Sequence, residues 1–145
     1  MILQLSVFLE NRAGRAAEMA RLLGQAGHNL RALMIADTSE FGVARMLVDR
    51  PLAARHTLET AGFGVSTTSV VAVEVPDTPG ALADVLEALD RGGLNVEYAY
   101  AFVEPSGGGA ANVFRMEEAE RAQQVLEAAG YRLLTAADIY ATDDN

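Results

Sequence analysis

The chain reads Asn11-Arg12-Ala13-Gly14 and then Gly27-His28-Asn29-Leu30, and it repeats both motifs as Asp77-Thr78-Pro79-Gly80 and Gly93-Leu94-Asn95-Val96. The displacement is 66 residues in both cases, from 11 to 77 and from 27 to 93. A constant displacement indicates an internal repeat, in which one small structural unit is used twice. The fold of that unit is therefore what the sequence has to reveal first.

The repeat extends beyond these motifs. The stretch from Leu58 to Phe63 returns as the stretch from Leu126 to Tyr131, now displaced by 68 residues (from 58 to 126), so the second copy is two residues longer. The run Gly107-Gly108-Gly109 lies where this extra length must sit. We expect two domains, at residues 1–68 and 69–145, each near the lower size limit for an independent core. The two halves are therefore expected to stabilise each other.

The first copy shows the patterns of strands and helices in turn. From Leu3 to Leu9 apolar residues alternate with others, as in a strand with one buried face. From Gly14 to Gln25 they recur at helical spacing, and Gly27 is a typical helix-ending residue. The same patterns predict strands over residues 3–9, 29–36 and 43–48, and a further strand from about residue 64. They predict helices over residues 14–25 and about 51–61, and a hairpin turn at residues 37–40.

The second copy predicts the same order, with strands over residues 71–75, 97–103, 110–116 and 133–140. Its first helix has a clearer apolar stripe, at Leu82, Val85, Leu86 and Leu89. The order βαββαβ is typical of the ferredoxin-like α+β fold, an antiparallel sheet with both helices on one face. Almost no linker separates the copies, so they must pack closely or share a strand. We expect the two repeats to pair into one continuous antiparallel sheet.

The composition excludes several classes of protein. The net charge is -9, the basic residues are all arginines, and no cluster of them is interleaved with aromatic residues, which disfavours nucleic-acid binding. There is no cysteine, hence no disulfide and no thiolate chemistry. No stretch is long and apolar enough for a membrane span, and no leader precedes the first strand, so we expect a cytoplasmic protein with no membrane partner.

The loop between the first strand and first helix of each copy is the candidate binding site. It ends at a helix N-terminus, where backbone N–H groups and the helix dipole favour an anion such as a carboxylate. Gly14 and Gly80 would let a ligand approach the backbone closely. The Asn11 amide can both donate to and accept from a zwitterion. Asn29 and Asn95, at the start of the next strand, would supply complementary contacts.

Structural explanations compete with this interpretation. Asn11 and Asp77 are also good helix N-cap residues, and Pro79 suits a first helical position. Asn29 and Asn95 tolerate the backbone angles that follow a helix-ending glycine. Propensity alone favours these structural roles.

The histidines, the methionines and one run of aromatic residues are the remaining candidates for a functional role. His28 and His56 have no partner at metal-ligand or catalytic spacing, so both are expected at the surface. No catalytic constellation, metal site or cofactor motif is apparent in the sequence. Met19, Met34, Met46 and Met116 are best explained as core residues. The alternating Tyr98, Tyr100 and Phe102 fit either a core or a contact with an apolar ligand group or the other copy.

These motifs resemble the ACT domain. The resemblance includes Gly42 to Asp49 and the helix end Ala61-Gly62-Phe63, and it covers nearly the whole chain twice. ACT domains are regulatory modules that bind amino acids or similar small ligands, usually where two domains pair edge to edge. The resemblance implies ligand contacts at Asn11, Arg12, Ala13, Gly14, Asn29, Leu30, Asp77, Thr78, Pro79, Gly80, Asn95 and Val96, and it favours the binding role of the asparagines over the capping one.

The two copies depart from the family pattern in different ways. Ala13 stands where the pattern often has proline, and Asp77 stands where ligand-binding members often have asparagine. A carboxylate at Asp77 would hold a ligand ammonium group but repel its carboxylate. The site around Asn11 is therefore the better candidate for a complete amino-acid pocket.

The two copies account for the whole length, so the resemblance implies a non-catalytic, stand-alone tandem ACT protein. It would bind a free amino acid between the repeats and report occupancy to a partner enzyme of amino-acid metabolism. A homodimer is compatible with this role. The alternative is a regulatory subunit that acts on a separate metabolic enzyme without a ligand of its own.

Overall fold

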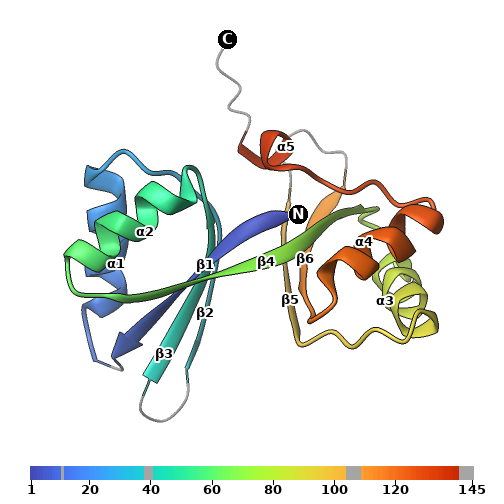
Figure 1. Ribbon diagram of the computed structural model, residues 1–145, viewed down its shortest axis with the longest axis horizontal. Coiled ribbons are helices and arrows are strands. Elements are labelled where there is room, and N and C mark those ends of the chain that lie inside the picture. Colours follow the sequence, from blue (N-terminus) through green and yellow to red (C-terminus); the bar gives the residue numbers. More distant parts are fainter. Residues whose placement is uncertain (11, 38–40, 104–108, 141–145) are drawn as a thin grey trace. The chain divides into compact units, whose positions relative to one another are not determined.

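A computed structural model describes residues 1–10, 12–37, 41–103 and 109–140. Figure 1 shows the elements along the chain, which are β1 (Ile2–Glu10), α1 (Arg15–Gln25), β2 (Leu30–Asp37), β3 (Phe41–Val48), α2 (Pro51–Thr60), β4 (Gly64–Val75), α3 (Ala81–Arg91), β5 (Tyr98–Val103), β6 (Ala110–Arg115), α4 (Ala119–Ala128) and α5 (Ala136–Tyr140). No helix among these is long and apolar enough to cross a membrane.

The chain divides into two compact units. Leu3–Thr68 form the first unit, and Met1–Ile2 together with Ser69–Asn145 form the second. Strand β4 contributes to both, because its residues 64–68 belong to the first unit and its residues 69–75 to the second. The sequence predicted strands on both sides of residue 68 and left open a strand shared by the two copies, and the shared strand is what the structure shows. No glycine or proline interrupts it after Gly64, so the backbone continues as one strand.

In the first unit, hydrogen-bonded neighbours follow the order β2-β3-β1-β4. β1 runs antiparallel to β3, with Leu5 opposite Met46 and Leu9 opposite Gly42. β2 runs antiparallel to β3 as well, and its register shifts once, between Leu30 and Ala32. The edge position of β2 and the central position of β1 are those of the ferredoxin-like fold.

The core of the first unit lies between this sheet and its two helices. Alternate residues of β1 and β3 point to the same face and are buried there, including Leu5 and Met46, both 0% exposed. Met19 and Leu23 of α1 and Leu58 of α2 complete the cluster. Figure 1 shows both helices on one side of these strands. Each fully buried leucine stabilises the unit by about 1.5–3 kcal/mol.

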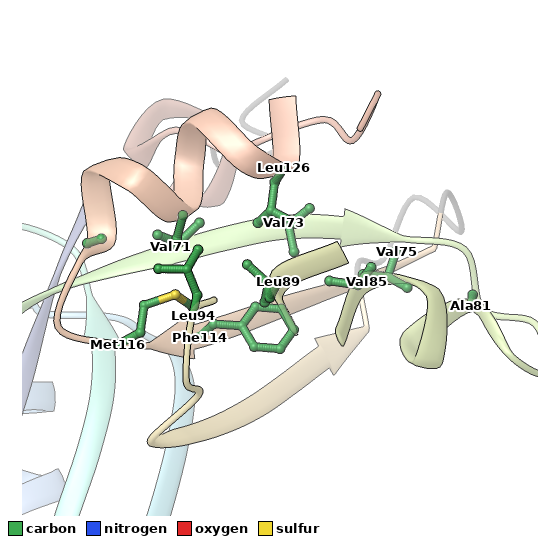
Figure 2. Close-up of a cluster of buried hydrophobic side chains, with 12 residues drawn as sticks. Val71, Val73, Val75, Ala81, Val85, Leu89, Leu94, Phe114, Met116 and Leu126 are labelled. Carbon is green, nitrogen blue, oxygen red and sulfur yellow. The ribbon is translucent and has the colours of Figure 1, made fainter. Parts of the chain in front are cut away.

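The second unit repeats this arrangement. Its strands follow the order β4-β6-β5, and β6 is antiparallel to both neighbours. Figure 2 shows the core, in which Phe114 of β6 and Val73 of β4 meet Leu89 of α3 and Leu126 of α4. The aromatic residues Tyr98, Tyr100 and Phe102 are half-buried and pair with Arg115, Val113 and Ala111, on the face turned away from these helices. They therefore do not belong to this core cluster.

The fourth strand of the second repeat was predicted over residues 133–140, and this prediction is wrong. Only Leu133 bridges to Val73, with hydrogen bonds from Glu74 N to Arg132 O (3.0 Å) and from Leu134 N to Ala72 O (2.8 Å). The chain then turns into α5. Thr135 and Asp138 cap this helix reciprocally, which ends the extended segment early.

The predicted fold class is confirmed, with βαββαβ order, antiparallel pairing and helices over one sheet face. The other predicted elements agree with the observed ones within a few residues. Of the predicted turn at residues 37–40, positions 38–40 lie outside the described residues, as do Gly107 and Gly108.

Candidate functional site

The loop between β1 and α1 is shaped by its backbone. Gly14 is the N-cap of α1 and has a left-handed conformation, with φ +92°, that favours glycine. Its carbonyl accepts a hydrogen bond from Glu18 N at 2.9 Å, while Arg12 N donates to Glu10 O at 2.8 Å. Arg12, Ala13 and Gly14 are all exposed. Asn11 lies outside the described residues, so its predicted role stays a prediction.

A cavity of about 380 Å³ opens beside this loop. It is called the loop cavity here, and it is lined by Leu9, Glu10, Arg12, Arg15, Ala16, Ile35 and Gly42. β1 supplies one wall and the start of α1 supplies a second. The C-terminal part of β2 and the N-terminal end of β3 supply a third. Its volume lies in the range of small-molecule sites. Of the residues predicted for the first site that the structure describes, only Arg12 lines the loop cavity.

The lining of the loop cavity combines both charges with apolar surface. Arg12 Nε lies 3.3 Å from Glu10 Oε2, and both side chains are about 60% exposed, so the two charges face solvent. Leu9, Ala16 and Ile35 add an apolar wall. A guanidinium and a carboxylate side by side match the carboxylate and ammonium of a zwitterion. Such a site would hold an amino acid through its charged ends and leave its side chain against the apolar wall.

Arg15 is the more rigid of the two arginines. Its side chain is only 12% exposed, it lies over the Phe63 ring at 4.1 Å, and Nη1 donates to Glu18 Oε2 at 2.8 Å. Stacking on an aromatic face fixes the plane of the guanidinium. Its Nε is buried and has no hydrogen-bond partner among the residues that the structure describes. Arg15 therefore offers a positioned cationic group at the edge of the loop cavity.

Asn29 and Leu30 lie at the opposite end of the sheet. Asn29 precedes β2, where Leu30 pairs with Val48, whereas Glu10 pairs with Phe41 at the other end of β3. Asn29 N donates to Asp49 Oδ1 at 2.9 Å, and Leu30 packs against the core. The first unit thus does not bring Asn29 together with Arg12. A binding role for Asn29 and Leu30 stays a prediction.

The corresponding loop of the second repeat has a similar backbone but different chemistry. Gly80 is the N-cap of α3 with φ +86°, and Asp77, Thr78, Pro79 and Gly80 are all exposed. At a displacement of 66 residues, Thr78 stands where the first repeat has Arg12, and Ala81 stands where it has Arg15 (12 to 78 and 15 to 81). This loop therefore lacks both guanidinium groups.

Asn95 lines a different cavity of about 300 Å³, together with Gly93, Leu94, Glu97, Met116, Glu117 and Glu118. Arg115 Nε lies 3.7 Å from Glu97 Oε2, and Arg121 Nη1 lies 3.3 Å from Glu118 Oε2. Three carboxylates in one cavity disfavour the carboxylate of an amino acid. Val96 is half-buried against the core. Asn95 thus lines a cavity whose charge differs from that of the loop cavity.

The structural roles expected for Asp77, Pro79, Asn29 and Asn95 are not found. Capping by Asp77 is wrong, because Gly80 is the N-cap and has no side-chain cap, and Pro79 therefore precedes the helix. Unusual angles at Asn29 and Asn95 are not found either. Among the described residues, Arg50 is the non-glycine residue with positive φ.

The two histidines lie in different environments. His56 is exposed on α2, as predicted. The surface prediction for His28 is wrong, because its side chain is 3% exposed and its Nδ1 lies 3.3 Å from Asp49 O. The contact with Asp49 explains how a polar ring is accommodated at a buried position. Within the described ranges, no group of three or more acidic, histidine or cysteine side chains is arranged to hold a metal ion.

Sequence reasoning missed the other lining residues of the loop cavity, which are Leu9, Glu10, Arg15, Ala16, Ile35 and Gly42. Glu10 and Arg15 flank the predicted loop, so extending the window by one residue in each direction would have found them. Gly42 lines the loop cavity because it pairs with Leu9 of β1. Ile35 lines the loop cavity because β2 pairs with β3. The register of two strands cannot be read from one sequence, so this residue could not be predicted.

Several solved structures are similar to this chain over most of its length. Protein BT0572 from Bacteroides thetaiotaomicron has a similar structure with a TM-score of 0.89 and 38% sequence identity, covering 97% of this chain and 96% of that chain. The ligand-free regulatory subunit of aspartate kinase from Thermus thermophilus has a TM-score of 0.66 and 18% identity, covering 88% and 91%. The corresponding subunit from Thermus flavus has a TM-score of 0.62 and 19% identity, covering 88% and 92%.

The two aspartate kinase subunits share the fold with this chain, at an identity that supports no more than the fold. No curated protein matches the chain. The family model described as the ACT domain pair matches residues 1–140. This match spans both repeats and agrees with the strand order of the two units. The chain belongs to the ACT domain pair family.

Proposed function

We propose that this protein is a non-catalytic regulatory protein that binds a free amino acid, and that the loop cavity of the first repeat holds it. Membership of the ACT domain pair family supports a regulatory role. The single observation that carries the ligand class is the ion pair of Arg12 with Glu10, with Arg15 beside it, around an apolar-walled cavity. Opposite charges a few ångströms apart are the complement of a zwitterion.

In this proposal, Arg15 and Arg12 bind the ligand carboxylate and Glu10 binds its ammonium group. The N-terminal end of α1 adds favourable electrostatics for the carboxylate. Leu9, Ala16 and Ile35 would contact the ligand side chain, which favours an apolar one. The second repeat lacks both arginines, so we propose that the first repeat holds the principal site.

Ligand binding would act on a partner through a shift between conformations of different affinity. We propose an enzyme of amino-acid metabolism as that partner and the cytoplasm as its location. The proposal also keeps the predicted domain boundary between residues 68 and 69. It retains as predictions the contacts of Asn11, Asn29, Asp77 and Asn95 and of their neighbours.

The first experiment is a thermal-shift screen of the purified chain against the twenty amino acids. A ligand that binds only the folded state at 100 times its dissociation constant adds about 2.7 kcal/mol to stability. We expect a selective shift from one amino acid or a few related ones. Calorimetric titration of that ligand should then show a roughly tenfold weaker affinity for Arg12→Ala, because a charge-assisted hydrogen bond is lost.

Arg55→Ala is the matched control. Arg55 is an exposed arginine on α2 that pairs with Glu59 at 2.9 Å, so its removal changes the net charge equally without touching the loop cavity. We expect it to bind the ligand as the wild type does. Asn11→Ala should also reduce the shift. Absence of a shift with every amino acid would contradict the sensor role and favour the ligand-independent regulatory subunit, whose enzyme would then be sought by co-purification.

A further inference from the structure

The floor of the loop cavity contains a glycine that the fold does not require. Gly42 is the second residue of β3 and pairs with Leu9 of β1. Its φ is not in the left-handed region, so no backbone conformation reserves this position for glycine. A Cβ at position 42 would lie 3.7 Å from Leu9 Cβ and 3.8 Å from Ala36 O, which are ordinary van der Waals distances. An alanine would therefore fit without strain.

The second repeat has a side chain at the same position of the fold. Ala110 is the equivalent residue, at a displacement of 68 residues (42 to 110). It begins β6 and pairs with Val75, as Gly42 pairs with Leu9 in the first repeat. Nothing in the described backbone or strand packing thus explains the glycine. Its effect is to leave open space in the loop cavity that it lines.

The helix wall of the loop cavity also carries a small side chain. Ala16 lies in the first turn of α1 and lines the cavity, and the second repeat has Leu82 in its place (16 to 82). Leu82 is 46% exposed, so this helix position accepts a leucine. The first repeat therefore has the smaller residue at both equivalent positions, Ala16 and Gly42. Both differences enlarge the same cavity.

An apolar side chain borders this space and is only partly covered. Ile35 lines the loop cavity and is 48% exposed, although it pairs with the fully buried core residue Ala44. An apolar group placed on Ile35 would remove its surface from water, which favours binding in proportion to the area covered. The cavity volume of about 380 Å³ equals that of roughly a dozen waters at about 30 Å³ each. Glycine, alanine or serine would leave much of it unfilled.

We propose that Gly42 and Ala16 determine the size of the ligand, and that the loop cavity takes an amino acid with a large apolar side chain, such as leucine or phenylalanine. This inference rests on the proposed function, because it concerns the same cavity. The charged ends of the ligand lie at Arg12 and Glu10. Its side chain lies over Gly42, between Ile35 and the start of α1.

Gly42→Ala tests the floor of the cavity by adding one methyl group to it. Calorimetric titration measures the affinities of the wild type and the variant for free alanine, valine, leucine and phenylalanine. We expect the wild type to prefer leucine or phenylalanine over alanine. The variant should lower this preference roughly tenfold or more, because one methylene changes affinity in an apolar pocket by this order. A variant that was merely less stable would bind all four more weakly by the same factor, so the ratio of affinities is the decisive quantity.

Gly24→Ala is the matched control, because it adds the same methyl group away from the cavity. Gly24 lies on α1, and a Cβ there would meet no described atom within 4 Å beyond its own helix. We expect its ratio of affinities to equal that of the wild type. Ala16→Leu repeats the test from the helix wall with the residue of the second repeat, and it should also lower the preference for the large ligands. Thermal unfolding followed by circular dichroism should show that Gly42→Ala folds as the wild type does.

The same titrations separate this inference from the proposed function. A wild type that prefers large apolar amino acids, together with a Gly42→Ala variant that has lost this preference, would support both. A wild type that binds a small or polar amino acid most tightly, or a variant with an unchanged ratio, would overturn the inference but still support the proposed function. A wild type that binds none of the twenty amino acids would contradict the proposed function, and this inference with it.

Discussion

At the scale of single residues, Asp49 connects the end of β3 to the residues that precede β2, at the end of the first unit that lies away from the loop cavity. Its Oδ1 accepts a hydrogen bond from Asn29 N at 2.9 Å and its carbonyl lies 3.3 Å from His28 Nδ1. The neighbouring Arg50 donates from Nη2 to Gly27 O at 3.1 Å. In the second repeat, Leu94 and Glu117 stand in place of His28 and Asp49, and a cavity opens there. The second repeat thus has neither the histidine nor the aspartate that hold this junction in the first.

We expect Asp49→Ala to lower the free energy of unfolding by about 1–3 kcal/mol, because the Asn29 amide loses its acceptor. The substitution also removes the carboxylate oxygen that lies 3.6 Å from His28 Nδ1, although the backbone carbonyl stays. Asp49→Asn keeps the side-chain oxygen and should cost less. Urea unfolding followed by circular dichroism measures both. Glu59→Ala, an exposed acid on α2, is the control and should stay within about 0.5 kcal/mol of the wild type. An Asp49→Ala protein as stable as the control would contradict this role.

At the scale of elements, α5 shows how a local signal overrides a strand pattern. Thr135 N donates to Asp138 Oδ2 at 2.8 Å, and Asp138 N donates to Thr135 Oγ1 at 3.2 Å. Thr-x-x-Asp is a capping-box pattern, and it starts the helix that buries Ile139. The prediction of a strand up to Tyr140 was therefore wrong. The capping residues were visible in the sequence.

The hydrogen bonds from Thr135 to the Asp138 carboxylate lower its pKa below the usual value, and Arg132 contributes further. A lowered pKa means that the carboxylate stabilises α5 at neutral pH and that this contribution is lost as the pH falls through the folded-state pKa. We expect NMR titration to show Asp138 protonating below the ordinary value for aspartate. In Thr135→Ala the pKa should move back towards that value. An unchanged titration would contradict the capping interaction.

The elements that were predicted correctly are those whose signal is local. Residue spacing alone reveals the helical stripe of Leu82, Val85, Leu86 and Leu89 and the alternation from Leu3 to Leu9. The candidate site was only partly predictable. Its loop follows from local glycines, but Ile35 and Gly42 reach the loop cavity through strand pairing, which depends on contacts distant in sequence.

At the scale of the whole molecule, one strand belongs to both repeats. β4 is 12 residues long, and it pairs with β6 in the second unit while its first part lies next to β1 in the strand order of the first. Unfolding of either unit would release half of this strand and weaken the pairing of the rest. The two repeats are therefore expected to unfold together, although each has its own core.

Leu23→Ala and Leu89→Ala test this coupling as a matched pair. The two leucines are equivalent in the repeat (23 to 89), and both are 0% exposed in their separate cores. Each substitution should cost about 2–5 kcal/mol through the cavity it leaves. If β4 couples the units, the wild type shows one calorimetric transition with equal van 't Hoff and calorimetric enthalpies, and each variant lowers the temperature of that whole transition. Two resolved transitions, each moved by only one of the variants, would mean that the shared strand does not transmit unfolding between the repeats.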